Sequence, residues 1–161
     1  SNAMSAGKRV LVAGVGNRLM GDDGFGPRVV DLLSSMSLPD YVDARDIGTA
    51  GITVATDLED YEKVIFLDSV ELEGPPGRLS KSILEVRGLD EDISQLARMT
   101  LHEVGLEGLL KFAKSIGVLP GEVTLIGCIP RSLKPSLELS EEVEAATHAA
   151  VDLVLEALGL E

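Results

Sequence analysis

The stretch that decides the fold is KRVLVAGV at residues 8–15, followed by GNRLMGDDG at residues 16–24. Residues 8–15 form a short apolar run closed by glycines, which is typical of a buried strand in a parallel sheet. Beyond residue 24, apolar side chains recur at helical spacing from Val29 to Met36. A strand, a glycine-containing loop and a helix in this order predict the first β-α unit of an α/β domain.

Strands and helices continue to alternate along the rest of the chain. Strands are expected at residues 41–47, 64–68, 79–86 and 122–129, and helices at residues 51–60, after Thr100 and after Ser140. The turn at residues 73–77 is tight, which favours an antiparallel direction for the strand that follows it. Thr100 with Glu103 matches a capping box, and Ser140 can cap a helix whose first turn is acidic. We therefore predict a three-layer α/β/α sandwich with a mainly parallel, twisted sheet.

Length and composition indicate one globular domain. Ser1-Asn2-Ala3 precede Met4 and are interpreted as the remnant of an expression tag, so the predicted domain spans residues 4–161. A chain of this length buries roughly two-thirds of its unfolded surface. Aromatic residues make up only 3% of the chain. The core must therefore be aliphatic, and an aromatic platform for stacking on nucleic-acid bases is excluded.

Net charge and cysteine content indicate which binding partners are disfavoured and which cellular compartment is expected. The formal net charge is −13, with 27 acidic residues against 14 basic ones, which disfavours nucleic acid and anionic membranes as partners. No apolar run approaches the ~18 residues that span a bilayer, and no signal peptide precedes the first strand. The single Cys128 excludes an intramolecular disulfide framework and suits a reducing compartment. We expect a cytoplasmic protein, for which a monomer suffices.

Polar side chains that could carry chemistry follow the predicted strands. Ligands of open parallel sheets bind beyond the carboxyl ends of the strands. The first strand is followed there by Asn17, Asp22 and Asp23, and the third ends in Asp68. His102 lies in the first turn of a helix that, by right-handed winding, should start at the same edge. Two carboxylates and an imidazole are a reasonable set of ligands for a divalent transition metal.

Each of these residues also has a plain structural interpretation. Asp22-Asp23 before Gly24 is a turn signature. An acid at the end of a parallel strand often caps the neighbouring loop, and a lone histidine in a first turn is often a surface or capping residue. Spacing alone leaves both interpretations open, and the joint placement at one edge favours a site.

In their order, these landmarks resemble the hydrogenase maturation endopeptidases. The opening consists of Gly14-Val15-Gly16-Asn17, Leu19 and the run from Gly21 to Gly26, and the match continues through Gly48-Thr49-Ala50-Gly51, Val64 to Asp68 and Leu101-His102-Glu103-Val104-Gly105-Leu106. Each motif is short and unspecific, whereas the ordered set from about Val10 to Leu110 is specific. The residues from Gly121 onward agree in length and pattern but add little specificity.

The resemblance implies a site, an activity and a partner. It implies that Asp23, Asp68 and His102 are the catalytic residues and contact nickel, and that the fold is an α/β/α sandwich. It further implies an aspartyl-type endopeptidase that removes the C-terminal extension of a [NiFe]-hydrogenase large-subunit precursor after nickel insertion. The nickel is then that of the precursor, and the enzyme uses it as a recognition signal.

Other enzyme classes fit the sequence less well. Gly14-x-Gly16 after a strand is reminiscent of a dinucleotide-binding loop, but Leu19 occupies the place of the third glycine and would crowd the contact between helix and strand. A P-loop is excluded because no Gly-Lys-Ser/Thr is present. A thiol protease built on Cys128 and His102 is a further alternative, although Cys128 lies within a predicted strand and is interpreted as core.

Two more interpretations stay open at this point. His148 shares a helix face with Glu144 and Asp152, which indicates a solvated surface rather than a site. A non-catalytic, nickel-binding hydrogenase assembly factor would carry the same metal ligands as the protease. Cleavage of a substrate distinguishes the two, and nickel binding alone does not.

Overall fold

The computed structural model describes residues 9–49, 51–85 and 103–160. Within these residues one sheet has the strand order β2-β1-β3-β5-β4. Its strands are β1 (Val10–Val15), β2 (Val42–Gly48), β3 (Lys63–Ser69), β4 (Leu79–Glu85) and β5 (Glu122–Cys128). All neighbouring strands pair in parallel except β4, which pairs antiparallel with β5. The mainly parallel sheet is therefore confirmed, including the antiparallel edge strand after the tight turn.

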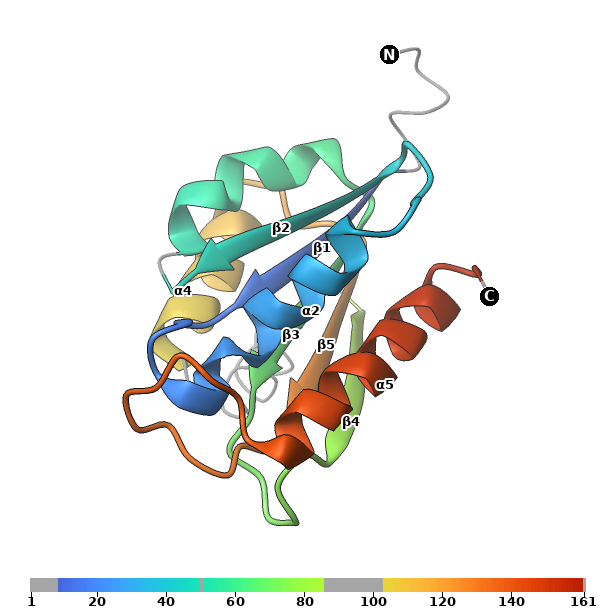
Figure 1. Cartoon of the computed structure of the whole chain (residues 1–161). Coiled ribbons are helices and arrows are strands. Elements are labelled where there is room, and N and C mark those ends of the chain that lie inside the picture. Colours follow the sequence, from blue (N-terminus) through green and yellow to red (C-terminus); the bar gives the residue numbers. More distant parts are fainter. Residues whose placement is uncertain (1–8, 50, 86–102, 161) are drawn as a thin grey trace.

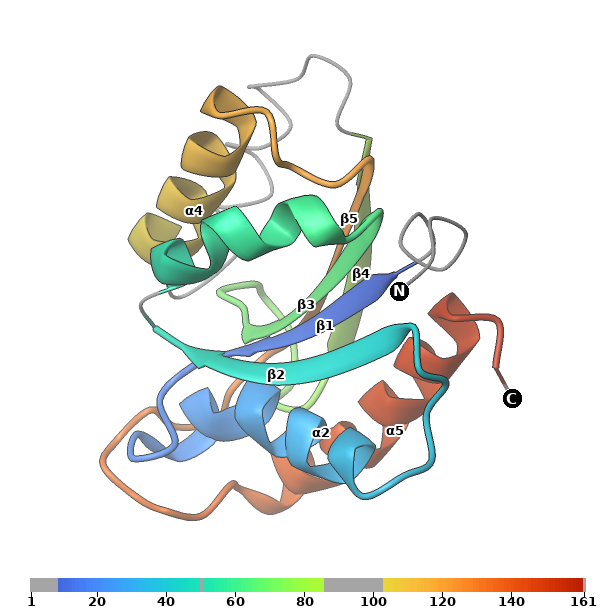
Figure 2. The same cartoon turned by 90° about the horizontal axis from the view of Figure 1, so that it is seen from above.

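Helices cover both faces of this sheet. Helices α2 (Phe25–Ser34) and α5 (Glu141–Ala157) lie on one face, and the 3-10 helix η2 (Gly51–Asp60) and α4 (Glu103–Ser115) lie on the other, as the view from above in Figure 2 shows. A short 3-10 helix, η1 (Gly21–Gly24), leads into α2. The three-layer α/β/α prediction is confirmed. No helix among the described residues is long and apolar enough to cross a bilayer.

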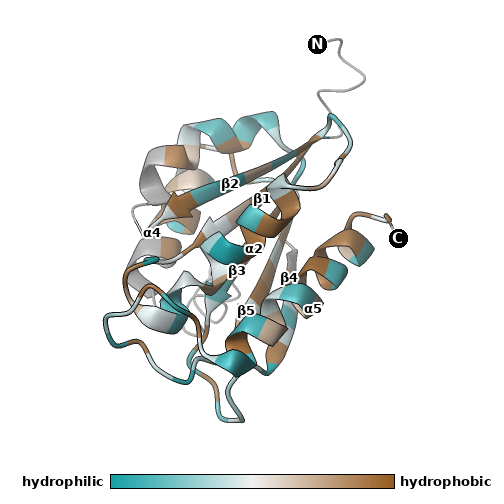
Figure 3. Cartoon of the chain, viewed as in Figure 1, coloured by the Kyte–Doolittle hydropathy of each residue, from teal (hydrophilic) through white to brown (hydrophobic). Residues whose placement is uncertain are grey.

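The apolar runs of the central strands serve two cores. Alternate side chains of β1 face opposite ways: Leu11 and Ala13 join the core under η2 and α4, whereas Val10 and Val12 join the core under α2 and α5. Because both faces are covered by helices, a central strand must be apolar at every position. Figure 3 shows brown, hydrophobic stretches along the strands, and teal alternating with brown along α2 and α5.

Two glycines bring the start of α2 against the carboxyl ends of the strands. A Cβ atom on Gly26 would lie 2.3 Å from the carbonyl oxygen of Leu67 in β3 and 2.6 Å from that of Val15 in β1. A Cβ atom on Gly14 would lie 2.6 Å from the carbonyl oxygen of Gly26. This close packing holds η1 beside the ends of β1 and β3. Leu19 is not part of this contact, because its side chain is exposed.

Most elements begin and end within a residue or two of the prediction. Helix α2 ends at Ser34, so Met36 lies beyond it, and residues 51–60 form a 3-10 rather than an α-helix. Ser140 caps α5 as predicted, accepting a hydrogen bond from the backbone N–H of Val143 at 3.4 Å. The proposed capping residue of α4, Thr100, lies outside the described residues.

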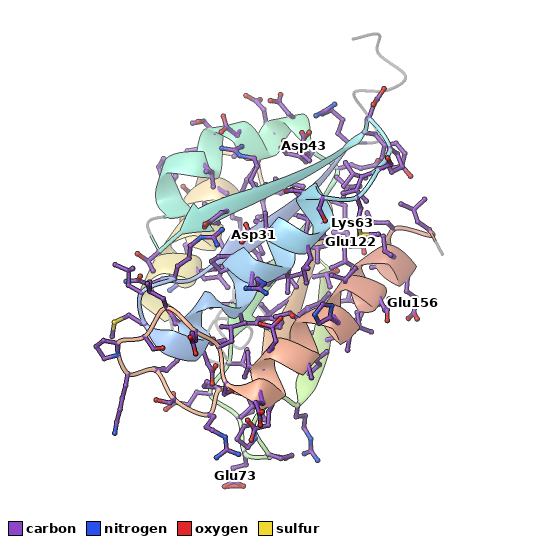
Figure 4. The ribbon with its side chains drawn as sticks, viewed as in Figure 1. Asp31, Asp43, Lys63, Glu73, Glu122 and Glu156 are labelled. Atoms are coloured by element: carbon purple, nitrogen blue, oxygen red, sulfur yellow. The ribbon has the colours of Figure 1, made fainter. Side chains whose placement is uncertain are left out.

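An ion pair links two neighbouring strands at the amino edge of the sheet. Lys63 at the start of β3 and Glu122 at the start of β5 are paired in register and form a 3.0 Å ion pair (Figure 4). Asn17, Asp22, Asp23 and Asp68, which the sequence analysis singled out, lie at the opposite, carboxyl edge.

Candidate active site at the carboxyl edge of the sheet

Asp68 is completely buried at the end of the central strand β3. It is the penultimate residue of the strand and lies in register with Gly127 of β5. Its Oδ1 accepts a hydrogen bond from the backbone N–H of Ser69 at 2.8 Å, which orients the carboxylate at the strand end. The Ser69 hydroxyl donates to the backbone carbonyl of Asp22 at 3.0 Å and so ties β3 to η1.

Asp23 lies in η1 and is 5% exposed. Its Oδ2 accepts a hydrogen bond from the backbone N–H of Asn17 at 2.8 Å. The tight return of the chain requires glycine at position 16, which has a φ of +142° and whose Cβ would lie 2.0 Å from the Asp23 carbonyl oxygen. Because η1 contacts β3, the turn that carries Asp23 and the strand that carries Asp68 meet at one edge of the sheet.

The predicted third residue, His102, lies outside the described residues. Helix α4 starts directly after it, at Glu103, and ends at Ser115. A connection of six residues, 116–121, leads from α4 to β5, whose first residue Glu122 lies at the amino edge of the sheet (Figure 2). A helix of this length is about 20 Å long, so α4 can start near the carboxyl edge. The position of His102 stays a prediction.

Among the described residues, no group of three His, Cys, Asp or Glu side chains is arranged to hold a metal ion. Of the three predicted ligands, only Asp23 and Asp68 are among the described residues. Their role in metal binding therefore also stays a prediction. Of the other landmarks at this edge, Gly48 accepts a hydrogen bond from the backbone N–H of Gly16 at 3.0 Å. The start of the loop after β1 is therefore joined to the last residue of β2 beside Asp23.

Arg18 links the loop after β1 to α2 and to β2. Its guanidinium forms hydrogen bonds of 2.7 and 2.8 Å to the two carboxylate oxygens of Asp31 on α2, and one of 3.0 Å to Asp46 on β2. The hydrogen bonds from Arg18 lower the pKa of Asp31. This bidentate pair fixes the loop after β1 by charged groups at the surface, whereas Asp22 fixes it from inside.

Asp22 is a buried anchor that sequence reasoning treated only as a turn residue or site candidate. Its carboxylate accepts hydrogen bonds from the backbone N–H groups of Arg131 at 2.8 Å, Ser132 at 3.2 Å and Ser140 at 2.7 Å, and from the Ser140 hydroxyl at 2.9 Å. These donors are more than 100 residues away in the chain, so spacing gives no signal for them. Asp22 therefore fastens both ends of the segment between β5 and α5 to η1.

Replacing Asp22 by asparagine should cost about 3 kcal/mol of unfolding free energy, because an amide nitrogen would face N–H donors that now bind a carboxylate. Urea denaturation measures this loss. The matched control is Asp31→Asn, which breaks an exposed ion pair with Arg18 and should cost less than about 1 kcal/mol. An equal loss in both variants would contradict the role of Asp22 as an anchor.

Cys128 ends β5 as a buried free thiol in the core under α2 and α5. Burial, with the nearby Asp22 charge, raises the pKa of the Cys128 thiol to about 12. A thiol protease needs a thiolate near neutral pH, so this environment is unsuitable for a nucleophile. The interpretation of Cys128 as a core residue is supported.

We expect Cys128→Ala to lower the unfolding free energy by about 1 kcal/mol and to leave proteolytic activity intact. Thermal unfolding and an activity assay on the same preparation check both parts. Loss of cleavage in a variant that remains folded would restore the thiol-protease alternative.

Comparison with known proteins supports the protease among the alternatives that the sequence left open. The family described as "Hydrogenase maturation protease" matches residues 27–157. The hydrogenase 2 maturation protease of Escherichia coli is 37% identical over 154 residues, covering 93% of this chain and 90% of that protein. The crystal structure of a hydrogenase 2 maturation peptidase from a Thaumarchaeota archaeon is 98% identical, covers 96% of this chain and 100% of its own, and superposes with a TM-score of 0.77.

A second solved structure shows that the fold is shared at lower identity. The hydrogenase maturating endopeptidase HybD from Escherichia coli is 35% identical, covers 93% of this chain and 91% of its own, and superposes with a TM-score of 0.83. These matches include the loop of Asp23, which precedes the residues matched by the family profile. The chain therefore belongs to the hydrogenase maturation protease family and is a processing endopeptidase.

Proposed function

We propose that this endopeptidase removes the C-terminal extension of a [NiFe]-hydrogenase large-subunit precursor after nickel has been inserted. Asp23, Asp68 and His102 form its active site and contact the nickel that the precursor holds. The observation that carries this assignment is that η1 and β3, each of which carries a buried aspartate, meet at the carboxyl edge of the sheet. This edge is where open α/β sheets bind their ligands.

The donor set suits contact with a nickel ion that belongs to the substrate. Asp23 and Asp68 offer carboxylate oxygens oriented by the backbone N–H groups of Asn17 and Ser69, and His102 offers an imidazole. Imidazole and carboxylate accept divalent transition metals, but the trio contains no thiolate. We therefore expect weak affinity for free nickel, so that the ion stays with the precursor and reports that insertion is complete.

In the simplest version of the chemistry, water attacks the scissile carbonyl and one of the two carboxylates accepts the proton of that water. The nickel of the precursor would polarise the carbonyl as a Lewis acid. Neither a serine nor a cysteine nucleophile is needed, in agreement with the raised pKa of Cys128. We place the reaction in the cytoplasm, where a protein with one cysteine and no intramolecular disulfide is expected.

The intact mass of a nickel-loaded large-subunit precursor, before and after incubation with this protein, tests the proposal. We expect the mass to fall by that of a single C-terminal peptide. An unchanged mass, with nickel-dependent binding retained, would support the alternative of a non-catalytic assembly factor.

A further inference from the structure

Two segments far apart in the chain form a joined surface beside Asp23. Met20 and Ser136 form a parallel β-bridge. The backbone N–H of Gly21 donates to the Ser136 carbonyl at 2.9 Å, and that of Ser136 donates to the Leu19 carbonyl at 3.0 Å. Glycine is required at position 21, because its φ is +59° and a Cβ would lie 2.8 Å from the Ser132 carbonyl oxygen. Backbone hydrogen bonds therefore hold the segment of Leu19 against the segment of Leu137.

This surface presents two large apolar side chains to solvent. Leu137 is 81% exposed and Leu19 is 61% exposed. Leu19 directly precedes Met20 and Leu137 directly follows Ser136, so the two leucines flank the bridge. They are the two most exposed large hydrophobic residues in the described part of the chain.

Polar contacts fix the backbone of the segments that carry the two leucines. Asp22 accepts hydrogen bonds at both ends of the segment that carries Leu137. Arg131, at the start of that segment, also forms a salt bridge to Glu142 on α5. Leu19 lies two residues after Asn17, whose backbone N–H holds the Asp23 carboxylate. Backbone hydrogen bonds from Asp23 to Met20 and from Gly21 to Ser136 therefore join both leucine-bearing segments to η1, which carries Asp23.

We propose that Leu19 and Leu137 form a docking surface for apolar side chains of the precursor next to the bond that is cleaved. This inference rests on the proposed function, since it takes the precursor as the occupant. The surface adjoins the candidate active site, and its rigid backbone would present the leucines without a cost of ordering on binding. Apolar contact also suits a chain whose net charge of −13 would repel an acidic peptide.

The test measures cleavage and binding of a purified nickel-loaded large-subunit precursor by the wild type and by Leu19→Ala, Leu137→Ala and the double variant. We expect each single substitution to raise KM and Kd by about fivefold to tenfold, since a buried leucine contributes more than an alanine. The kcat should stay within about twofold, because docking contacts are made equally in the ground and transition states. Thermal unfolding should be unchanged, as both side chains are exposed.

The control is Ile83→Ala on the edge strand β4, since Ile83 is 60% exposed and lies outside this surface. It should bind and cleave like the wild type. Unchanged KM and Kd in the double variant would overturn the docking surface and leave the proposed function standing. A fall in kcat alone would also overturn it. Wild-type protein that binds the precursor without cutting it would contradict the proposed function, while the Kd comparison would still decide the docking surface.

Discussion

Asp68→Asn is expected to lower kcat/KM for the nickel-loaded precursor by about 10²–10⁴-fold, the range for loss of a general base. The asparagine has the shape of the aspartate, and its oxygen can still accept the hydrogen bond that Ser69 N–H now donates. It cannot accept a proton from water or offer a charged oxygen to nickel. Because the substitution keeps the shape of the side chain and this hydrogen bond, the melting temperature should not fall by more than a few degrees.

The matched control for this prediction is Asp152→Asn, which removes one carboxylate from the exposed side of α5. It should leave both processing and stability unchanged. A steady-state assay with thermal unfolding of each variant checks the pair. If Asp68→Asn processes the precursor at the wild-type rate, Asp68 has a purely structural role at the end of β3.

His102→Ala should abolish processing in a protein that remains folded. The proposed trio contains one imidazole, and no other residue of the trio can replace it as a nitrogen ligand. The chain contains only two histidines, so His148→Ala is a natural control. The His148 side chain is 64% exposed on α5 and pairs with Glu144 at 3.5 Å, as expected for a solvated face.

Processing by the two histidine variants can be compared by gel separation of precursor and product. Loss of activity in both variants, or in neither, would remove His102 from the site. Activity restored to His102→Ala by added imidazole would support a ligand or proton-transfer role rather than a role in folding.

The strands and layers could be predicted because local chemistry determines them. The fully apolar run of β1 required helices on both of its faces, and the tight turn before β4 indicated an antiparallel edge strand. Ser140 is a cap whose partner, Val143, is three residues away. Features of this kind are encoded over a few residues, so no knowledge of the tertiary structure is needed.

Features that depend on distant partners were missed. The anchoring role of Asp22 depends on Arg131, Ser132 and Ser140, more than 100 residues further along the chain. The bridge that joins Leu19 to the segment of Leu137 depends equally on tertiary packing. For the candidate site, the sequence predicted that Asp23 and Asp68 lie at the same edge of the sheet. His102 lies outside the described residues, so its predicted position stays a prediction.

Nickel dependence is the most direct test of the account. Nickel-loaded and metal-free large-subunit precursors are incubated with this protein, the metal-free sample with a strong chelator, and the intact mass of each is followed. We predict that only the nickel-loaded precursor loses its C-terminal peptide, because the Asp23, Asp68 and His102 side chains contact an ion that the precursor supplies. Efficient cleavage of the metal-free precursor in the presence of chelator would contradict this, and would leave those three residues with an acid–base or structural role.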